Sequence, residues 1–177
     1  ISTIVGFVLG VNAAWRRGQW FDRFSAVWSG FARSIPEYAL AYVLLLIGCL
    51  GLGWFPTAGA YTAFTQGNSI LYRVQDIFVH SVLPCLSLII SLLGAKFLIA
   101  RNSMIAAVGQ DYVLLARAKG LSTRRVKYHH AARNAWAPFL AQFAIQLGVA
   151  VGGAIFVETV FNYPGLGSLV LSAVNAR

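Results

Sequence analysis

The sequence predicts an all-α, polytopic transmembrane helical bundle. Of its 177 residues, 58% are hydrophobic and only 11% are charged, whereas soluble domains carry about 25% charged residues. The apolar residues also stand in long blocks, and not at the spacing of an amphipathic helix or a half-buried strand. Together these observations favour a membrane protein.

Three uncharged blocks predict membrane spans. They cover residues 38–55, 77–95 and 135–157, and each approaches or exceeds the roughly 20 residues that cross about 30 Å of hydrocarbon. With their flanks, we expect spans at about 35–55, 77–100 and 136–158. Residues 1–15 are uncharged too, without a basic leader that would indicate a signal peptide. We expect them to form part of a further span, in a chain truncated at both ends.

Proline and glycine support these boundaries. Pro36 stands in the first turn of the second span, where proline is tolerated, and Pro56 with Gly59 marks a turn that closes it. Pro84 and Pro138 each come early in their spans. The sequence leaves open whether Pro84 kinks the third span.

The positions of the basic residues predict the orientation of the chain. Four lie between the first and second spans, one between the second and third, and seven between the third and fourth. Because basic connections stay in the cytoplasm, residues 16–34 and 101–135 are predicted to be cytoplasmic and residues 56–76 extracytoplasmic. Lys96, near the cytoplasmic end of the third span, is expected to extend to the interface.

This distribution also bears on partners. The net charge of +9 is better explained by membrane topology than by a phosphate-binding face, so we expect a lipid bilayer and no nucleic acid. Cys49 and Cys85 both lie in apolar stretches without metal spacing, and are interpreted as small apolar residues.

The segment 101–135 is predicted to hold two short helices around Gly120. Asp111 is a good helix cap, and Lys119 followed by Gly120 is a typical helix end. Ser122 is expected to start a second helix that runs toward Asn134. Such a helix–turn–helix is suited to contact a soluble partner, although basic loops more often only fix topology.

Short motifs along nearly the whole chain carry a family resemblance. They are Gly10, Ala13-Ala14, Arg17-Gly18, Phe21-Asp22, Ser34-Ile35-Pro36, Phe55-Pro56, Gly59, His80, Leu83-Pro84, Asp111-Tyr112-Val113, Ala116 to Leu121, Arg133-Asn134-Ala135, Gly152-Gly153, Glu158 to Phe161 and Pro164 to Gly167. In this order and spacing they resemble the dipeptide, oligopeptide and nickel permeases of ABC importers. The segment around Gly120 resembles their EAA-type cytoplasmic loop, with Leu114 where the general signature has an acid.

The resemblance implies an inner-membrane permease subunit of a prokaryotic peptide importer. Its implied partners are a second homologous permease subunit, two ATP-binding subunits and an extracytoplasmic substrate-binding protein. The ATPases would carry ATP and Mg²⁺, so no cofactor is expected in this chain. The implied ATPase-coupling residues are Asp111, Ala116, Arg117, Ala118, Lys119, Gly120, Leu121, Arg124 and Arg125. Within the family, glutathione, nickel and other small solutes remain alternative cargoes.

Three polar residues are candidates for the translocation pathway. Gln142 and Gln146 are four residues apart and share one helix face; they either line the pathway or join helices by hydrogen bonds. Glu158 either contacts a cationic substrate group or bonds the backbone of the following turn. His80 is interpreted as a hydrogen-bonding residue rather than a nickel ligand.

Catalysis by this chain is not expected. The sequence has no phosphate-binding loop, no nucleophile elbow and no zinc-protease motif, so ATP hydrolysis is assigned to partner subunits. An ion-coupled secondary transporter or channel is a weaker alternative, because it would need intramembrane carboxylates. A membrane-embedded enzyme is disfavoured by the missing catalytic clusters.

Overall fold

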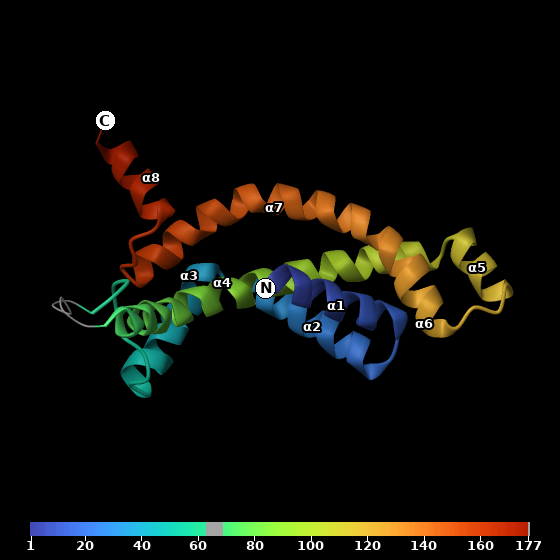
Figure 1. Cartoon of the computed structure of the whole chain (residues 1–177), viewed down its shortest axis with the longest axis horizontal. Coiled ribbons are helices and arrows are strands. Elements are labelled where there is room, and N and C mark those ends of the chain that lie inside the picture. The colour runs from blue at the N-terminus through green and yellow to red at the C-terminus, as the bar shows by residue number, and fades with distance from the viewer. Residues whose placement is uncertain (63–68, 177) are drawn as a thin grey trace. The chain divides into compact units, whose positions relative to one another are not determined.

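The computed structural model describes residues 1–62 and 69–176, apart from the side chains at 147, 149–151 and 153. The regular elements in these residues are all helical, which confirms the all-α class (Figure 1). They are α1 (Ser2–Trp15), α2 (Trp20–Ser34), α3 (Glu37–Leu45), the π-helical turn η1 (Leu46–Gly51), α4 (Ile70–Val108), α5 (Asp111–Ala118), α6 (Thr123–Arg125), the π-helical turn η2 (Val126–Ala132), α7 (Arg133–Val160) and α8 (Leu166–Asn175).

One helix of the described residues, α4, is by itself long and apolar enough to cross a membrane. Helix α2 and the run Glu37–Gly51 meet the same criterion only as a pair. Helix α4 has 39 residues, about 58 Å at 1.5 Å per residue, and so exceeds a hydrocarbon layer of about 30 Å. It therefore includes residues that the sequence placed in both flanking connections.

The chain divides into two compact units. The first unit comprises residues 1–34 and 92–147, and the second comprises 35–91 and 148–177. Helices α4 and α7 each contribute one part to each unit.

In the first unit, α1 packs closely on α4. A Cβ atom at Gly6 would lie 2.7 Å from the Cβ of Lys96, and one at Gly10 would lie 2.7 Å from the Cβ of Ala100. These contacts advance together along both helices, so α1 and this part of α4 run parallel. Lys96 is only 4% exposed and its Nζ lies 4.5 Å from the ring centre of Phe143. The expectation that Lys96 extends to an interface is therefore wrong within this unit, because α1 covers its stem.

Helix α2 packs on the same part of α4 in the opposite direction. The Arg101 guanidinium donates two hydrogen bonds to Asp22, at 2.6 and 2.9 Å, and one of the Asp22 oxygens also accepts from the Gly18 N–H at 3.0 Å. About two turns further along both helices, a Cβ at Gly94 would lie 2.7 Å from the Ser29 carbonyl oxygen. Asp22 is 3% exposed, so its charge is matched inside the protein.

The second unit has its own small core, formed by Ala41, Cys49, Leu83, Val157 and Phe161. The helical run that begins at Glu37 ends at Gly51, four residues before the predicted end of the second span at 55. Gly53 follows with φ of +63°, a conformation that glycine adopts without steric cost and that stops a helix. Residues 63–68 of the predicted extracytoplasmic connection 56–76 lie outside the described residues.

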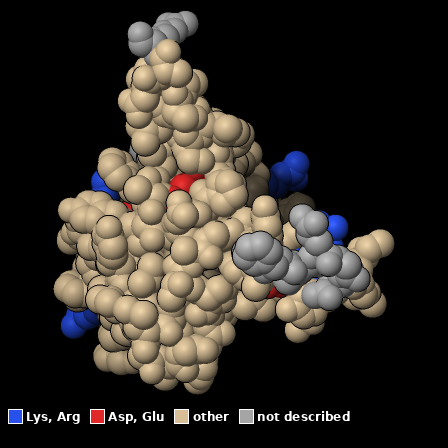
Figure 2. Space-filling model, turned by 90° about the vertical axis from the view of Figure 1, so that its left-hand side faces the viewer, with Lys and Arg blue, Asp and Glu red and all other residues tan. Residues whose placement is uncertain are grey.

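Pro84 does not interrupt α4, which continues on both sides of it. Ser87 donates a 2.8 Å hydrogen bond to the Pro84 carbonyl oxygen. Figure 2 shows a face of the chain on which charged side chains are few. Large apolar residues are exposed along several helices, as expected of a chain that lipid or other subunits cover.

Candidate functional site

Helix α5 has a buried face and an exposed face. Val113 is 1% exposed and Ala116 is 4% exposed, and both join a core that includes Val11 of α1, Met104 of α4 and Val126 of η2. The residues between them point outward. The helical spacing thus anchors α5 to the first unit and leaves its other side exposed.

The exposed face of α5 is apolar at its centre. Leu114 is 68% exposed and Leu115 is 56% exposed. Together with Tyr112 and Ala118 they line a shallow hollow. From the sequence, Leu114 is only a departure from the EAA signature. Two adjacent leucines between Val113 and Ala116 are the sequence signal that the exposed face of this helix is apolar as well.

The ends of α5 differ in part from the prediction. Gln110 occupies the cap position, so Asp111 is the first residue of the helix and not its cap. An acid in this first turn still interacts favourably with the helix dipole. Gly120 has φ of +72° and its N–H donates to the Arg117 carbonyl oxygen at 2.9 Å. The predicted helix end at Gly120 is confirmed.

The second helix of the segment is not short. Ser122 holds the cap position of α6, as predicted, but α6, η2 and α7 follow one another without a break from Thr123 to Val160. The predicted end near Asn134 is therefore wrong. No turn-forming residue interrupts the sequence there, and the basic segment passes directly into the fourth predicted span.

Most of the predicted coupling residues lie on the exposed side of this segment. Asp111, Arg117, Ala118, Lys119, Gly120, Arg124 and Arg125 are exposed, and Leu121 is half-buried. Ala116 differs from the others: its small side chain is 4% exposed and packs in the core of the unit.

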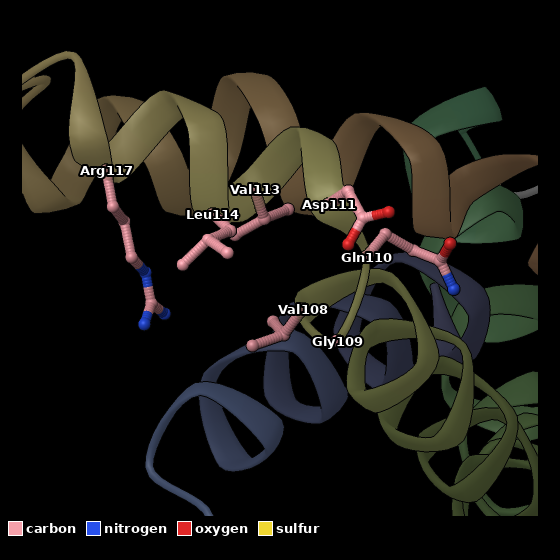
Figure 3. A pocket seen from close by; sticks show the side chains of 7 residues that line it. All are labelled: Val108, Gly109, Gln110, Asp111, Val113, Leu114 and Arg117. Atoms are coloured by element: carbon pink, nitrogen blue, oxygen red, sulfur yellow. The ribbon is translucent and has the colours of Figure 1, made fainter.

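A small pocket lies between the end of α4 and α5 (Figure 3). Its volume is about 180 Å³, and it is lined by Val108, Gly109, Gln110, Asp111, Val113, Leu114 and Arg117. In Figure 3 the side chains of Val113 and Leu114 point from α5 toward Val108. The Arg117 guanidinium carbon lies 5.3 Å from the ring centre of Trp15, a cation–π contact that positions the cation at one edge of the site.

Polar contacts fix η2 to α1. The Lys127 ammonium donates to the Asn12 side-chain oxygen at 2.5 Å, and the Tyr128 hydroxyl donates to the same oxygen at 3.3 Å. Both are contacts between distant parts of the sequence, and neither was found by sequence reasoning. They hold η2 against α1, which packs in the same core as α5.

The structure describes the three pathway candidates separately, since Gln142 and Gln146 belong to the first unit and Glu158 to the second. Gln142 is exposed. The Gln146 side-chain oxygen is buried and has no hydrogen-bond partner among the described residues.

Glu158 is engaged with the backbone after it. Its two carboxylate oxygens accept hydrogen bonds from the N–H groups of Gly167, at 3.2 Å, and Ser168, at 2.8 Å. Both N–H groups lie in the first turn of α8, where a negative charge is favourable. A Cβ at Gly165 would collide with the carboxylate. The geometry agrees with the interpretation that Glu158 organises this turn.

A second small cavity lies in the same unit. It has a volume of about 170 Å³ and is lined by Ser81, Pro84, Cys85, Leu88, Ala154, Val157, Glu158 and Tyr163. The Ser81 and Tyr163 hydroxyls are 2.9 Å apart. His80, the residue before Ser81, places Nδ1 2.8 Å from the Asp76 carbonyl oxygen, which confirms a hydrogen-bonding role. Within the described residues no three metal-ligating side chains come together.

The fold and this segment define a class: a helical membrane protein with a short, anchored helix whose exposed face is apolar and basic. The chain belongs to the family of binding-protein-dependent transport system inner membrane components, whose model matches residues 6–177.

Individual relatives are similar over the whole chain. A Sinorhizobium fredii protein named "Probable peptide ABC transporter permease protein y4tP" is 36% identical over 177 residues, which is 100% of this chain and 54% of the relative. The glutathione transport system permease protein GsiC is 35% identical in Escherichia coli (strain K12) and 34% identical in Salmonella typhimurium. Each GsiC match covers 99% of this chain and 53% of the relative. The chain thus spans about half the length of the curated relatives that it matches.

Proposed function

We propose that this chain is the membrane-spanning subunit of an ATP-driven ABC importer for peptides or the peptide-like glutathione. The family match over residues 6–177 supports the transporter class. The names of the relatives, a peptide permease and glutathione permeases, support the cargo. The chain itself does no chemistry in this proposal; ATP and Mg²⁺ bind to separate subunits.

The observation that carries the coupling role is the two-faced helix α5. Val113 and Ala116 fix it to α1, α4 and η2, while Leu114, Leu115 and the basic residues around Gly120 are free. An ATPase subunit with an apolar cleft bordered by acidic residues would complement this surface. The apolar side chains would supply most of the binding free energy, and the basic residues around Gly120 would supply specificity.

Transmission of force follows from the same contacts. A displacement of α5 is passed to η2 through the core residues that they share. The Lys127–Asn12 hydrogen bond ties η2 to α1, which packs in the same core. Because η2 continues into α7 without a loop, the movement enters the fourth predicted span directly. The nucleotide-driven closure of two ATPases then biases the pathway between two states, as a rigid-body switch does.

The remaining parts of the proposal concern assembly and orientation. A second, homologous permease subunit completes the pathway, and an extracytoplasmic binding protein delivers the cargo. Residues 16–34 and 101–135 are on the cytoplasmic side, and residues 56–76 are on the extracytoplasmic side. The exposed side chain of Gln142 supports a pathway or subunit contact on its face of α7.

The test compares two leucine-to-alanine variants in the intact transporter. Leu114→Ala removes an exposed side chain from α5, and Leu169→Ala removes one of similar exposure, 64%, from α8. Both substitutions preserve helix propensity. If Leu114 contributes about 1.4 kcal/mol to docking, its loss weakens coupling about tenfold. We expect ATP-driven uptake into proteoliposomes to fall several-fold in the first variant only; equal effects would refute the docking surface.

Gly120→Asp provides an independent variant. A Cβ at this position meets no atom within 4 Å, and Asp tolerates positive φ better than most residues. The subunit should remain in the membrane while ATP hydrolysis no longer drives uptake. Normal uptake by this variant would contradict the coupling role. Competition of unlabelled dipeptides, longer peptides and glutathione for uptake identifies the cargo.

A further inference from the structure

Helix α2 carries an apolar stripe that nothing in the described chain covers. Its five members lie at intervals of four, three, one and three residues, which is one face of an α-helix: Trp20, Phe24, Val27, Trp28 and Phe31. They are between 55% and 75% exposed. Trp20 and Phe24 stack with ring centres 5.2 Å apart.

The opposite face of α2 is polar and packed. Asp22 bonds to Arg101, and the Ser29 backbone lies against Gly94 of α4. This arrangement inverts that of a soluble surface helix, in which the apolar face is buried and the polar face is free. Such an inversion is expected where the surroundings of the helix are apolar.

Three arginines border one end of the stripe. Arg16 and Arg17 lie in the turn before α2, Arg23 lies in its first turn, and all three are exposed. In the part of the chain that the structure describes, none of the three forms an ion pair. Arg33 is exposed as well, but it comes four residues after Ser29 and so lies on the other face of α2.

The dimensions of the stripe match one leaflet of a bilayer. From Trp20 to Phe31 it extends about 16 Å at 1.5 Å per residue, and half of the hydrocarbon thickness is about 15 Å. Tryptophan and arginine at one end are typical of the membrane–water interface.

We propose that the turn at Arg16 and the exposed face of α2 form a binding site for an anionic phospholipid of the cytoplasmic leaflet. The arginines bind the negatively charged phosphate of the lipid headgroup, and the acyl chains lie along the aromatic stripe. Charge complementarity selects the anionic lipid, because cytoplasmic leaflets carry the negative surface potential that attracts basic segments. The inference rests on the membrane orientation given under the proposed function.

The experiment compares two arginines of the same helix in the complete, delipidated transporter complex. Phosphatidylglycerol or phosphatidylcholine is titrated into the detergent-solubilised complex, and bound lipids are counted by native mass spectrometry. An arginine near an anionic headgroup contributes about 1 kcal/mol, or about fivefold in affinity. We expect Arg23→Gln to weaken phosphatidylglycerol binding about fivefold, and Arg33→Gln to change it less than twofold.

Further arms separate the alternatives. Arg23→Lys should keep most of the affinity, since it retains the charge. Glycerol phosphate, which lacks acyl chains, should not displace the lipid. A photoreactive group at Phe24→Cys should give an adduct with the mass of a lipid; an adduct with another subunit would overturn the proposal. So would equal binding of the two lipids, or equal effects of Arg23→Gln and Arg33→Gln.

Uptake measured on the same preparations separates this proposal from the transporter role. Intact uptake without lipid selectivity would refute the lipid site alone. Lipid selectivity without any ATP-driven uptake would refute the importer and leave the lipid site standing.

Discussion

Replacement of Gly10 by alanine tests the packing of α1 on α4. The added Cβ would lie 2.7 Å from the Ala100 Cβ, 2.7 Å from the Phe97 carbonyl oxygen and 2.8 Å from the Arg101 nitrogen. Favourable contacts between carbon atoms lie at about 3.5–4.0 Å, so α1 must move away by about 1 Å. Two of the three obstructing atoms belong to the backbone and cannot rotate aside. Overpacking of this kind costs about 1–3 kcal/mol.

Gly30→Ala is the matched control. Gly30 also lies inside a helix, but a Cβ there meets no atom within 4 Å. Both variants gain about 1 kcal/mol of helix propensity, and this gain cancels in the comparison. The difference in stability between the two variants therefore reports the steric cost alone, about 1–3 kcal/mol.

The assay is thermal unfolding of each complete subunit in detergent, followed by the fraction that remains monodisperse after heating. We expect Gly10→Ala to unfold several degrees below Gly30→Ala. Since Val11 and Ala14 belong to the core that carries α5, Gly10→Ala should also lower ATP-driven uptake. Equal midpoints, or a more stable Gly10→Ala, would show that α1 does not pack on α4 through this residue.

Three other substitutions have expected outcomes. Asp22→Asn removes the charge that Arg101 pairs with and should destabilise the subunit by about 3 kcal/mol; a loss below about 0.5 kcal/mol in the same melting assay would mean that the pair is not buried. Glu158→Ala leaves the first N–H groups of α8 without an acceptor and should cost about 1–2 kcal/mol; faster proteolysis near residue 166 would report the loosened helix, and unchanged proteolysis would contradict the cap. Val113→Ala should lower stability by about 1–3 kcal/mol, whereas Leu114→Ala should change it by less than about 0.5 kcal/mol; the reverse order would mean that α5 presents its other face.

The sequence predicted the elements that depend on local signals. The end of α5 at Gly120 was predictable because only positive φ is needed there, and the all-α class followed from uncharged blocks. The split of α5 into two faces was not predicted. Val113, Leu114 and Ala116 are all apolar or small, and only the contacts with α1 and η2 decide which of them are buried.

The polar pairs between distant parts of the chain could not be predicted from the sequence either. Asp22 and Arg101 are 79 residues apart, and Lys127 and Asn12 are 115 residues apart. From their charge, Arg101 and Lys127 were predicted only to lie in a connection between spans and to set the orientation of the chain. The buried position of Lys96 was missed for the same reason, since only the neighbouring helix α1 excludes it from the interface.

The π-helical turn η2 has a consequence for how this segment tolerates change in length. Such turns generally arise from one extra residue within an α-helix, and each residue rotates an α-helix by about 100°. Shortening residues 126–132 by one would restore a regular helix and leave the later side chains of α7 facing almost the same way, because the wider turn already absorbs the extra residue. The same deletion within the regular helix of α7 would instead rotate every later side chain by about 100°, so that Gln142 and Gln146 would face elsewhere if it preceded them. The chain is thus expected to accept the loss of one residue inside η2 more readily than the loss of one residue just after it.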